Sequence, residues 1–161
     1  MIVSHRHKLI FFAIPKTATH AIRIALRPHL DDTDEEQVGL FVQKKIADPD
    51  LAKISHGHIS CRQMRDVSDE GLWSSYFKFA FVRNPFDRFV SYCAFMNRNN
   101  PDFHQRPQSY MYNTLMSKNN KKHILFQQQY KFICDENENL LTDFVGRFES
   151  LENDYHQVCE K

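Results

Sequence analysis

The feature that most constrains the fold of this chain is a continuous apolar run at residues 9–14, which ends at the polar turn Pro15-Lys16-Thr17. A run that is apolar at every position is typical of a central parallel strand covered on both faces. After Ala18 the apolar residues recur at helical spacing up to about His29. This pattern predicts a strand that leads through a short polar turn into a helix, which is half of a βαβ unit.

A second junction of the same kind begins with the aromatic run at residues 77–82, which predicts another strand. Pro85 ends that strand, because proline lacks an amide donor and fits the first turn of a helix. A further strand is expected near residues 142–148, with a helix from Ser150. The alternation of strands and helices predicts an α/β, three-layer, P-loop-like fold with a mainly parallel central sheet. Ligands of such sheets bind at the carboxyl ends of the strands.

Three other segments have interpretable patterns. The acidic stretch at residues 31–36 indicates a loop and the start of a helix, whose apolar stripe continues through residues 38–46. Ser60, with Gln63 three residues later, predicts a capping box that opens a short helix. Residues 97–108 are polar and contain two prolines, so we expect a mobile surface loop of the kind that covers active sites.

Size and charge limit the class of protein. A chain of 161 residues with 42% hydrophobic residues can bury one sizeable core and is too short for two ordinary domains. We therefore expect a single domain over residues 1–161. The 21 basic and 20 acidic residues give a net charge of +1, which argues against nucleic-acid binding. Any site for an anion must be local.

The cysteines and the N-terminal residues bear on the compartment. The four cysteines lie far apart, without the spacing of a zinc site or a disulfide framework, so we expect reduced and mostly buried thiols. The apolar run that follows the basic N-terminal residues is too short for a signal peptide or a transmembrane segment. We expect a cytoplasmic protein of bacterial type, with a trimmed luminal domain as the alternative.

Each junction carries residues that suit an anion. At the first, Lys16, Thr17 and Thr19 would place a cation and two hydroxyls beside the amides that open a helix. The turn is similar to a P-loop, but Pro15 stands where a P-loop has glycine before its lysine. At the second, an arginine at a strand end could hold a phosphate, and a serine eight residues later could add a hydroxyl. The alternatives are an incidental surface lysine and an ordinary ion pair of that arginine, Arg83, with a nearby carboxylate.

Together the two junctions resemble a known family. Residues 15–19 after an aromatic strand, and then residues 81–92 (FVRNPFDRFVSY), are similar to the 5′-phosphosulfate loop and the 3′-phosphate motif of sulfotransferases. The nearest likeness is to the carbohydrate branch that includes heparan sulfate 2-O-sulfotransferase and the chondroitin or dermatan sulfotransferases. The likeness runs in order from residue 9 to residue 148, and it includes residues 129–133 and 143–149.

The resemblance implies a donor and the residues that hold it. The donor is 3′-phosphoadenosine 5′-phosphosulfate (PAPS), a co-substrate, and the family needs no metal. Its lysine loop holds the 5′-phosphosulfate, and its arginine and serine hold the 3′-phosphate. In this chain the donor-binding positions are Pro15, Lys16, Thr17, Ala18, Thr19, His20, Arg83 and Ser91. Related loops continue with a hydroxyl residue where this chain has His20, and family members usually extend beyond the position of Lys161, which implies a missing C-terminal segment.

His56 and His58 resemble the histidine pair near the acceptor of the 2-O-sulfotransferases. An acceptor hydroxyl must lose its proton as it attacks sulfur, and a neutral imidazole near its normal pKa can accept that proton. We therefore expect His58 to be the base, assisted by His56, while Lys16 stabilises the leaving phosphate. Two alternatives are a metal site formed with Cys61 and a pair of structural histidines.

The sequence thus predicts an enzyme that transfers a sulfuryl group from PAPS to a hydroxyl acceptor. The histidine pair favours a saccharide as that acceptor. One alternative is a P-loop-type nucleotide phosphotransferase, such as a kinase, which the missing glycines oppose. The other is a non-catalytic nucleotide-binding module.

Overall fold

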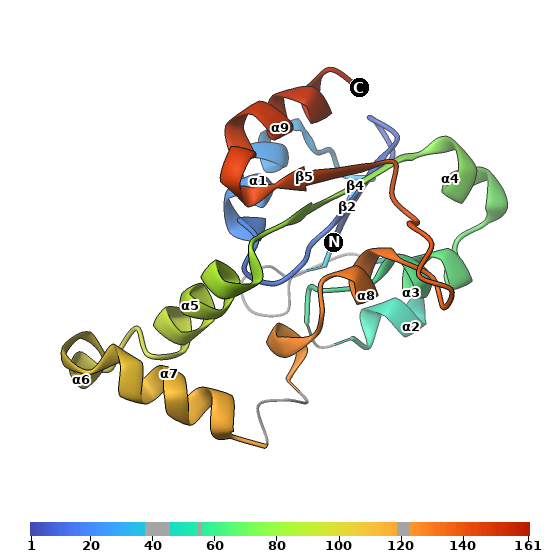
Figure 1. Cartoon of the computed structure of the whole chain (residues 1–161). Coiled ribbons are helices and arrows are strands. Elements are labelled where there is room, and N and C mark those ends of the chain that lie inside the picture. Colours follow the sequence, from blue (N-terminus) through green and yellow to red (C-terminus); the bar gives the residue numbers. More distant parts are fainter. Residues whose placement is uncertain (38–45, 55, 119–122) are drawn as a thin grey trace.

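The computed structural model describes residues 1–37, 46–54, 56–118 and 123–161. Its strands are β1 (Ile2–Ser4), β2 (Leu9–Phe12), β3 (Glu35–Glu36), β4 (Phe77–Val82) and β5 (Phe144–Arg147). They form one sheet in the order β3-β1-β2-β4-β5 (Figure 1). β2, β4 and β5 run parallel, whereas β1 is antiparallel to β2 and β3. The sheet is therefore mixed, and the predicted parallel arrangement holds for its central strand β2 and for β4 and β5.

Helices cover both faces of this sheet (Figure 1). One face packs against α1 (Thr19–Leu26) and α9 (Leu151–Cys159). The opposite face packs against α2 (Pro49–Ala52), α3 (Cys61–Val67) and α8 (Tyr130–Ile133). The remaining elements are the helices α4 (Glu70–Ser75), α5 (Pro85–Met96), α6 (Pro101–Gln105) and α7 (Pro107–Met116), and the 3₁₀ turns η1 (Arg27–His29), η3 (Ile124–Phe126) and η4 (Phe148–Ser150). The predicted α/β fold is thus confirmed, with helices on both sides of the sheet.

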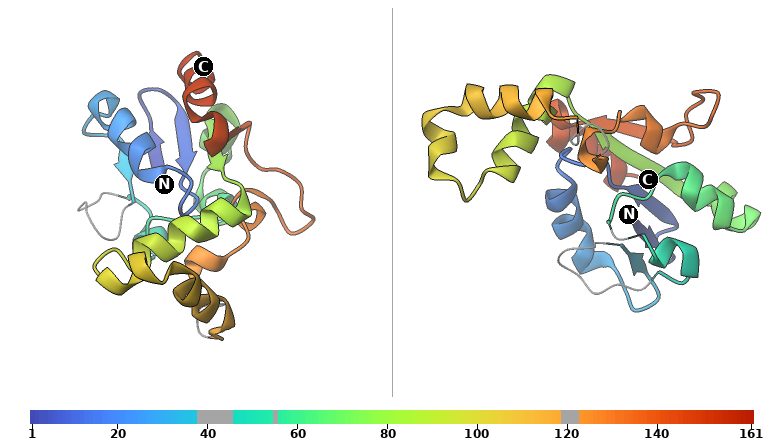
Figure 2. Two further views of the ribbon diagram at one scale, coloured as in Figure 1. Left: turned by 60° about the vertical axis from the view of Figure 1, so that its left-hand side comes forward. Right: turned by 90° about the horizontal axis from the view of Figure 1, so that it is seen from below.

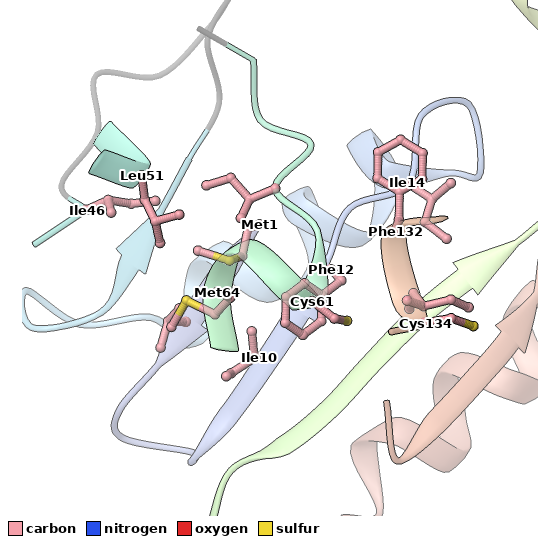
Figure 3. Packing of buried hydrophobic residues seen from close by; sticks show 14 residues of the cluster. Met1, Ile10, Phe12, Ile14, Ile46, Leu51, Cys61, Met64, Phe132 and Cys134 are labelled. Atoms are coloured by element: carbon pink, nitrogen blue, oxygen red, sulfur yellow. The ribbon is translucent and has the colours of Figure 1, made fainter. Parts of the chain in front are cut away.

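The apolar run at residues 9–14 explains this layering. Successive side chains of a strand point to opposite faces, so a strand that is covered on both sides must be apolar throughout. Ile10 and Phe12 join the core beneath α3 and α8 (Figure 3), whereas Phe11 joins the core beneath α1 and α9. Phe11 also stacks on Phe79 of β4 with ring centroids 5.2 Å apart. The strand is shorter than predicted, because its ladder ends at Phe12 and the next residues turn toward α1.

The segment predicted to be a loop, residues 97–108, is largely helical, and that prediction is wrong. α6 and α7 occupy it, and together with α5 they project away from the sheet (Figures 1 and 2). Pro101 and Pro107 each stand in the first turn of a helix, where the missing amide costs nothing. A small core of its own, centred on Tyr92, Cys93 and Phe103, holds this projection together.

Three further expectations have mixed outcomes. The capping box of Ser60 and Gln63 is confirmed, with both reciprocal hydrogen bonds present. Residues 31–36 do not open a helix: they form a turn and β3, and the buried carboxylate of Asp34 accepts hydrogen bonds from the β1 end of the sheet. The helix expected over residues 38–46 falls almost wholly outside the described residues, within which only Ile46 joins the core.

The prediction for the cysteines is confirmed. Cys61, Cys93 and Cys134 are buried free thiols, and Cys159 is an exposed one. Within residues 1–37, 46–54, 56–118 and 123–161, no helix has the length and apolar character needed to cross a membrane.

Candidate functional site

Residues 14–19, here called the Lys16 loop, join β2 to α1. Lys16 and Ala18 both adopt a left-handed conformation with φ of 66°. Such alternation turns successive amides to one side and forms a concave anion-binding nest. Ala18 is also the N-cap of α1, and no side chain caps the first amides of that helix. The loop therefore presents unpaired N–H groups and the positive end of a helix dipole to any anion placed above it.

The threonine hydroxyls of the Lys16 loop have a different partner from the one expected. Thr17 and Thr19 both donate to the carbonyl oxygen of Ile14, at 2.9 and 2.6 Å. A hydroxyl has one proton, so neither can also donate to a phosphate in this arrangement. Thr17 is fully buried and Thr19 nearly so. Their hydroxyls close the loop over the end of β2, and the groups that face an anion are amides and Lys16.

The ammonium group of Lys16 lies over an aromatic ring on the neighbouring helix. Its Nζ is 4.2 Å from the ring centroid of Phe95 in α5. The pKa of Lys16 is lowered by burial and by the positive charges of Arg83 and Arg98. Lys16 and Arg83, which follow two neighbouring parallel strands, are thus close enough to repel each other. Because β2 and β4 are parallel neighbours, the two junctions lie at the same end of the sheet.

Arg83 directly follows β4 and is held by its main chain and by stacking. Its amide and carbonyl pair with the side-chain amide of Gln129, at 2.9 and 2.8 Å. Its guanidinium lies 3.9 Å from the ring centroid of Phe148. The Nε of Arg83 is buried without a hydrogen-bond partner, and an unmet buried donor costs about 1–3 kcal/mol.

The alternative of a local ion pair is not found, since no described carboxylate lies within ion-pair distance of Arg83. Asp87, the nearby candidate, is exposed on α5. Ser91, on the same helix, is half-buried. Arg83 is consequently free to bind a ligand anion.

His58 lies beside the last residues of the β2 segment. Its Nδ1 is 2.7 Å from the carbonyl oxygen of Ala13, and because a carbonyl only accepts, Nδ1 carries the proton and Nε2 the lone pair. Burial lowers the pKa of His58 to about 3, which corrects the expectation of a pKa near the normal value. His56 accepts the main-chain N–H of His58 at its Nδ1, 3.3 Å away, and burial lowers its pKa as well.

The two histidines line one side of a polar pocket of about 470 Å³. α3 and α8 provide most of the opposite walls. The lining residues are His56, His58, Ser60, Arg62, Gln63, Asp66, Ile124, Gln127, Lys131, Phe132 and Glu136. The pocket is thus rich in hydrogen-bonding groups, and its charged side chains balance, with Arg62 and Lys131 against Asp66 and Glu136.

The metal alternative gains no support. Within the described ranges there is no group of three histidine, cysteine or acidic side chains placed to hold a metal ion. Cys61 is fully buried in the core below the sheet (Figure 3), and burial raises the pKa of its thiol. It is a packing residue at the start of α3 and does not face the histidine pocket.

The comparison with family models decides the identity. A model described as the sulfotransferase family matches residues 1–161. The chain belongs to the sulfotransferase family. The comparisons with curated proteins and with solved structures gave no match. Membership establishes a transferase that moves a sulfuryl group, and the geometry above shows which side chains of this sulfotransferase gather at one edge of the sheet.

The structure places two of the predicted donor-binding residues differently from the rest. His20 is exposed on the first turn of α1, and no described residue forms a hydrogen bond with its side chain. Ser91 lies on α5, and its side chain makes no hydrogen bond to a described residue. The other positions, in the Lys16 loop and at Arg83, lie directly after the carboxyl ends of β2 and β4.

Arg88 of this sulfotransferase has a structural role that no sequence pattern assigned to it. Its buried guanidinium donates to the carbonyl oxygens of Pro15, Gln127 and Leu125, at 2.8, 2.9 and 3.1 Å. It therefore ties the Lys16 loop to the wall of the histidine pocket. The available signal was a charged residue one turn before Tyr92, on the helix face that packs inward.

Proposed function

We propose that this sulfotransferase uses PAPS as its donor and transfers the sulfuryl group to a hydroxyl of a carbohydrate. The observation that carries this proposal is the buried Nε of Arg83, which has no partner among the described residues. Arg83 directly follows β4, and the neighbouring strand β2 leads into the uncapped Lys16 loop. Two separate anion sites on neighbouring parallel strands suit a nucleotide with two separate phosphate groups. The 5′-phosphosulfate would bind the Lys16 loop, and the 3′-phosphate would bind Arg83 and Ser91.

The proposed reaction is an in-line transfer without a covalent enzyme intermediate. The acceptor oxygen forms a bond to sulfur as the bond from sulfur to the 5′-phosphate oxygen breaks. Adenosine 3′,5′-bisphosphate leaves, and Lys16 with the loop amides stabilises the charge that develops on its phosphate. The acceptor proton passes to Nε2 of His58, because Nδ1 already donates to Ala13.

The low pKa of His58 is compatible with this role once the donor is bound. Burial disfavours the charged imidazolium when the site holds no anion. A donor with several negative charges would reverse part of that effect, since nearby opposite charge raises the pKa of a histidine. His58 would then accept a proton when donor and acceptor are both present, and it would stay neutral otherwise.

The pocket beside His56 and His58 is the proposed site of the acceptor. Its volume of about 470 Å³ suits one or two sugar units. Its walls carry amides, a hydroxyl and balanced charges, which can bind the hydroxyls of a saccharide. Arg88 fixes the distance between this pocket and the Lys16 loop, which keeps acceptor and donor in one geometry.

The test combines ligand binding with transfer of labelled sulfate to a panel of oligosaccharides. Adenosine 3′,5′-bisphosphate should bind more tightly than ATP, and a kinase-like protein would show the reverse. Lys16→Ala and Arg83→Ala should weaken bisphosphate binding, while His58→Ala should abolish transfer and leave binding intact. Lys53→Ala, which removes an exposed lysine paired with Asp50, is the matched control. Normal turnover by all three site variants would refute the mechanism, and tight binding without any transfer would identify a non-catalytic module.

A further inference from the structure

Arg98 shares an aromatic ring with the lysine of the Lys16 loop. Its guanidinium carbon lies 4.5 Å from the ring centroid of Phe95, and Lys16 Nζ lies 4.2 Å from the same centroid. Each cation is attracted to the ring, and the two like charges repel each other, since the charge of Arg98 helps to lower the pKa of Lys16. Phe95 therefore holds two cations together at the end of α5 beside the Lys16 loop.

The charge of this group is not neutralised by protein. No carboxylate in the described part of the chain pairs with Lys16, Arg83 or Arg98. Among the described residues, the Arg98 side chain makes one hydrogen bond, from Nη1 to the carbonyl oxygen of Phe95 at 2.9 Å. That bond fixes the guanidinium over the ring, while the other N–H groups of the fork stay available. Concentrated and unpaired positive charge of this kind favours a strongly anionic ligand.

We propose that Arg98 is a further donor-binding residue, which contacts the 5′-phosphosulfate end of the nucleotide next to Lys16. This inference rests on the proposed function, because it assigns one more contact to the same donor. Neither the sequence motifs nor the family match points to Arg98. Its assignment comes from its position over Phe95.

Position along α5 decides which end of the donor Arg98 serves. Arg83 precedes the helix and stacks on Phe148, whereas Phe95 and Arg98 lie at the opposite end of α5. Lys16, the residue of the 5′ loop, rests at the Phe95 end. Arg98 therefore belongs to the 5′ side.

Ligands that lack one phosphate separate the two ends. Dissociation constants are measured by calorimetry for adenosine 3′,5′-bisphosphate, adenosine 5′-monophosphate and adenosine 3′-monophosphate, with the wild type, Arg98→Ala and Arg83→Ala. Arg98→Ala should weaken the two ligands that carry a 5′-phosphate by roughly ten-fold and leave the 3′-monophosphate unchanged. Arg83→Ala should show the opposite pattern, weakening only the two ligands that carry a 3′-phosphate. Phe95→Leu, which removes the ring, should resemble Arg98→Ala.

The control is Arg106→Ala, which removes another exposed arginine, one that pairs with Asp102 outside the site. It should bind all three ligands as the wild type does. An Arg98→Ala protein that binds both 5′-phosphate ligands normally overturns the inference and leaves the proposed function standing. An Arg98→Ala protein that loses affinity only for the ligands with a 3′-phosphate also overturns the inference. A wild-type protein that fails to bind the bisphosphate overturns both.

Discussion

His58 donates its Nδ1 proton to the carbonyl oxygen of Ala13, 2.7 Å away, and this bond fixes the chemistry of the ring. The lone pair is left on Nε2, and the ring is held at the carboxyl edge of the sheet. Since burial lowers its pKa to about 3, the imidazole is neutral at physiological pH. A neutral ring of one tautomer, oriented by a main-chain acceptor, is what a proton acceptor at this edge requires.

His58→Asn tests the role of Nε2. The asparagine amide can still donate to Ala13 in place of Nδ1, but it offers no basic nitrogen on the far side. We expect transfer to fall by about 10²–10⁴-fold, the usual contribution of a general base, with the affinity for adenosine 3′,5′-bisphosphate unchanged. Turnover with labelled donor and calorimetric titration measure the two quantities. In the control His56→Asn, the side-chain oxygen can accept the His58 N–H, so we expect a much smaller loss. Equal activity of the His58 variant and the wild type would contradict the role.

The depressed pKa of His58 also predicts how stability depends on pH. A histidine in the unfolded chain titrates near 6.5, whereas His58 in the folded chain titrates near 3. Between these values the unfolded state binds a proton that the folded state does not, so stability falls as the pH drops through this window. Urea unfolding at several values between pH 7.5 and 4.5 should show a steeper decline for the wild type than for His58→Asn. Parallel curves would show that His58 is not buried as described.

The third prediction concerns the carbonyl oxygen of Ile14, which accepts hydrogen bonds from both Thr17 and Thr19. Thr17→Val keeps the shape of the buried side chain but removes its hydrogen bond to Ile14. We expect a loss of about 1 kcal/mol in the free energy of unfolding, or roughly 2–4 °C in Tm. Thr19 donates to the same oxygen, so the two substitutions should not act independently. Thr19→Val should change the free energy of unfolding by a different amount in the Thr17→Val protein than in the wild type. Thr17→Ser is the control and should remain close to the wild type. Additive losses would mean that the two hydroxyls act independently.

Much of the fold could be predicted from local sequence patterns. The apolar runs, Pro85 and the capping box at Ser60 act within a few residues, so their consequences can be read directly from the chain. β1 was missed, because a three-residue strand carries no recognisable period and forms only by pairing with β2. The prolines at residues 101 and 107 were interpreted as loop signals, although proline is equally suited to the first turn of a helix.

The candidate site was predictable where residue type determines chemistry. Lys16 and Arg83 follow strands, and the topology of parallel strands brings them to the same edge of the sheet. The role of Arg88 depends on partners 37–73 residues away, and that of Arg98 depends on Lys16 of another segment lying over the same ring, which no local pattern encodes. The low pKa of His58 likewise depends on burial that only the tertiary structure provides.

Gly146 lets β5 approach a core ring of β4 closely. A Cβ at this position would meet two ring carbons of Phe81 at 2.8 Å and a third more closely. Phe81 is fully buried, so its ring cannot move aside without displacing the core. We expect Gly146→Ala to lower the free energy of unfolding by about 1–3 kcal/mol, as overpacking usually does. Thermal unfolding measures this, with Gly71→Ala as the control, since a Cβ at the helical Gly71 meets only the side-chain oxygen of Asp69 at 3.1 Å. A tolerated Gly146→Ala would show that the β4–β5 spacing is not set by this contact.

Arg88 should matter for both stability and donor binding, because its guanidinium satisfies three main-chain carbonyls at once. Arg88→Met leaves those carbonyls without their donor and should lower the free energy of unfolding by about 3 kcal/mol or more. Arg88→Lys should recover only part of this loss, since an ammonium group cannot reproduce the planar fork of a guanidinium. If the bond to Pro15 positions the Lys16 loop, Arg88→Lys should also weaken bisphosphate binding at a temperature where it is fully folded. Calorimetric titration of the folded variant separates that effect from stability. Unchanged affinity in a destabilised Arg88→Lys protein would restrict Arg88 to holding the fold.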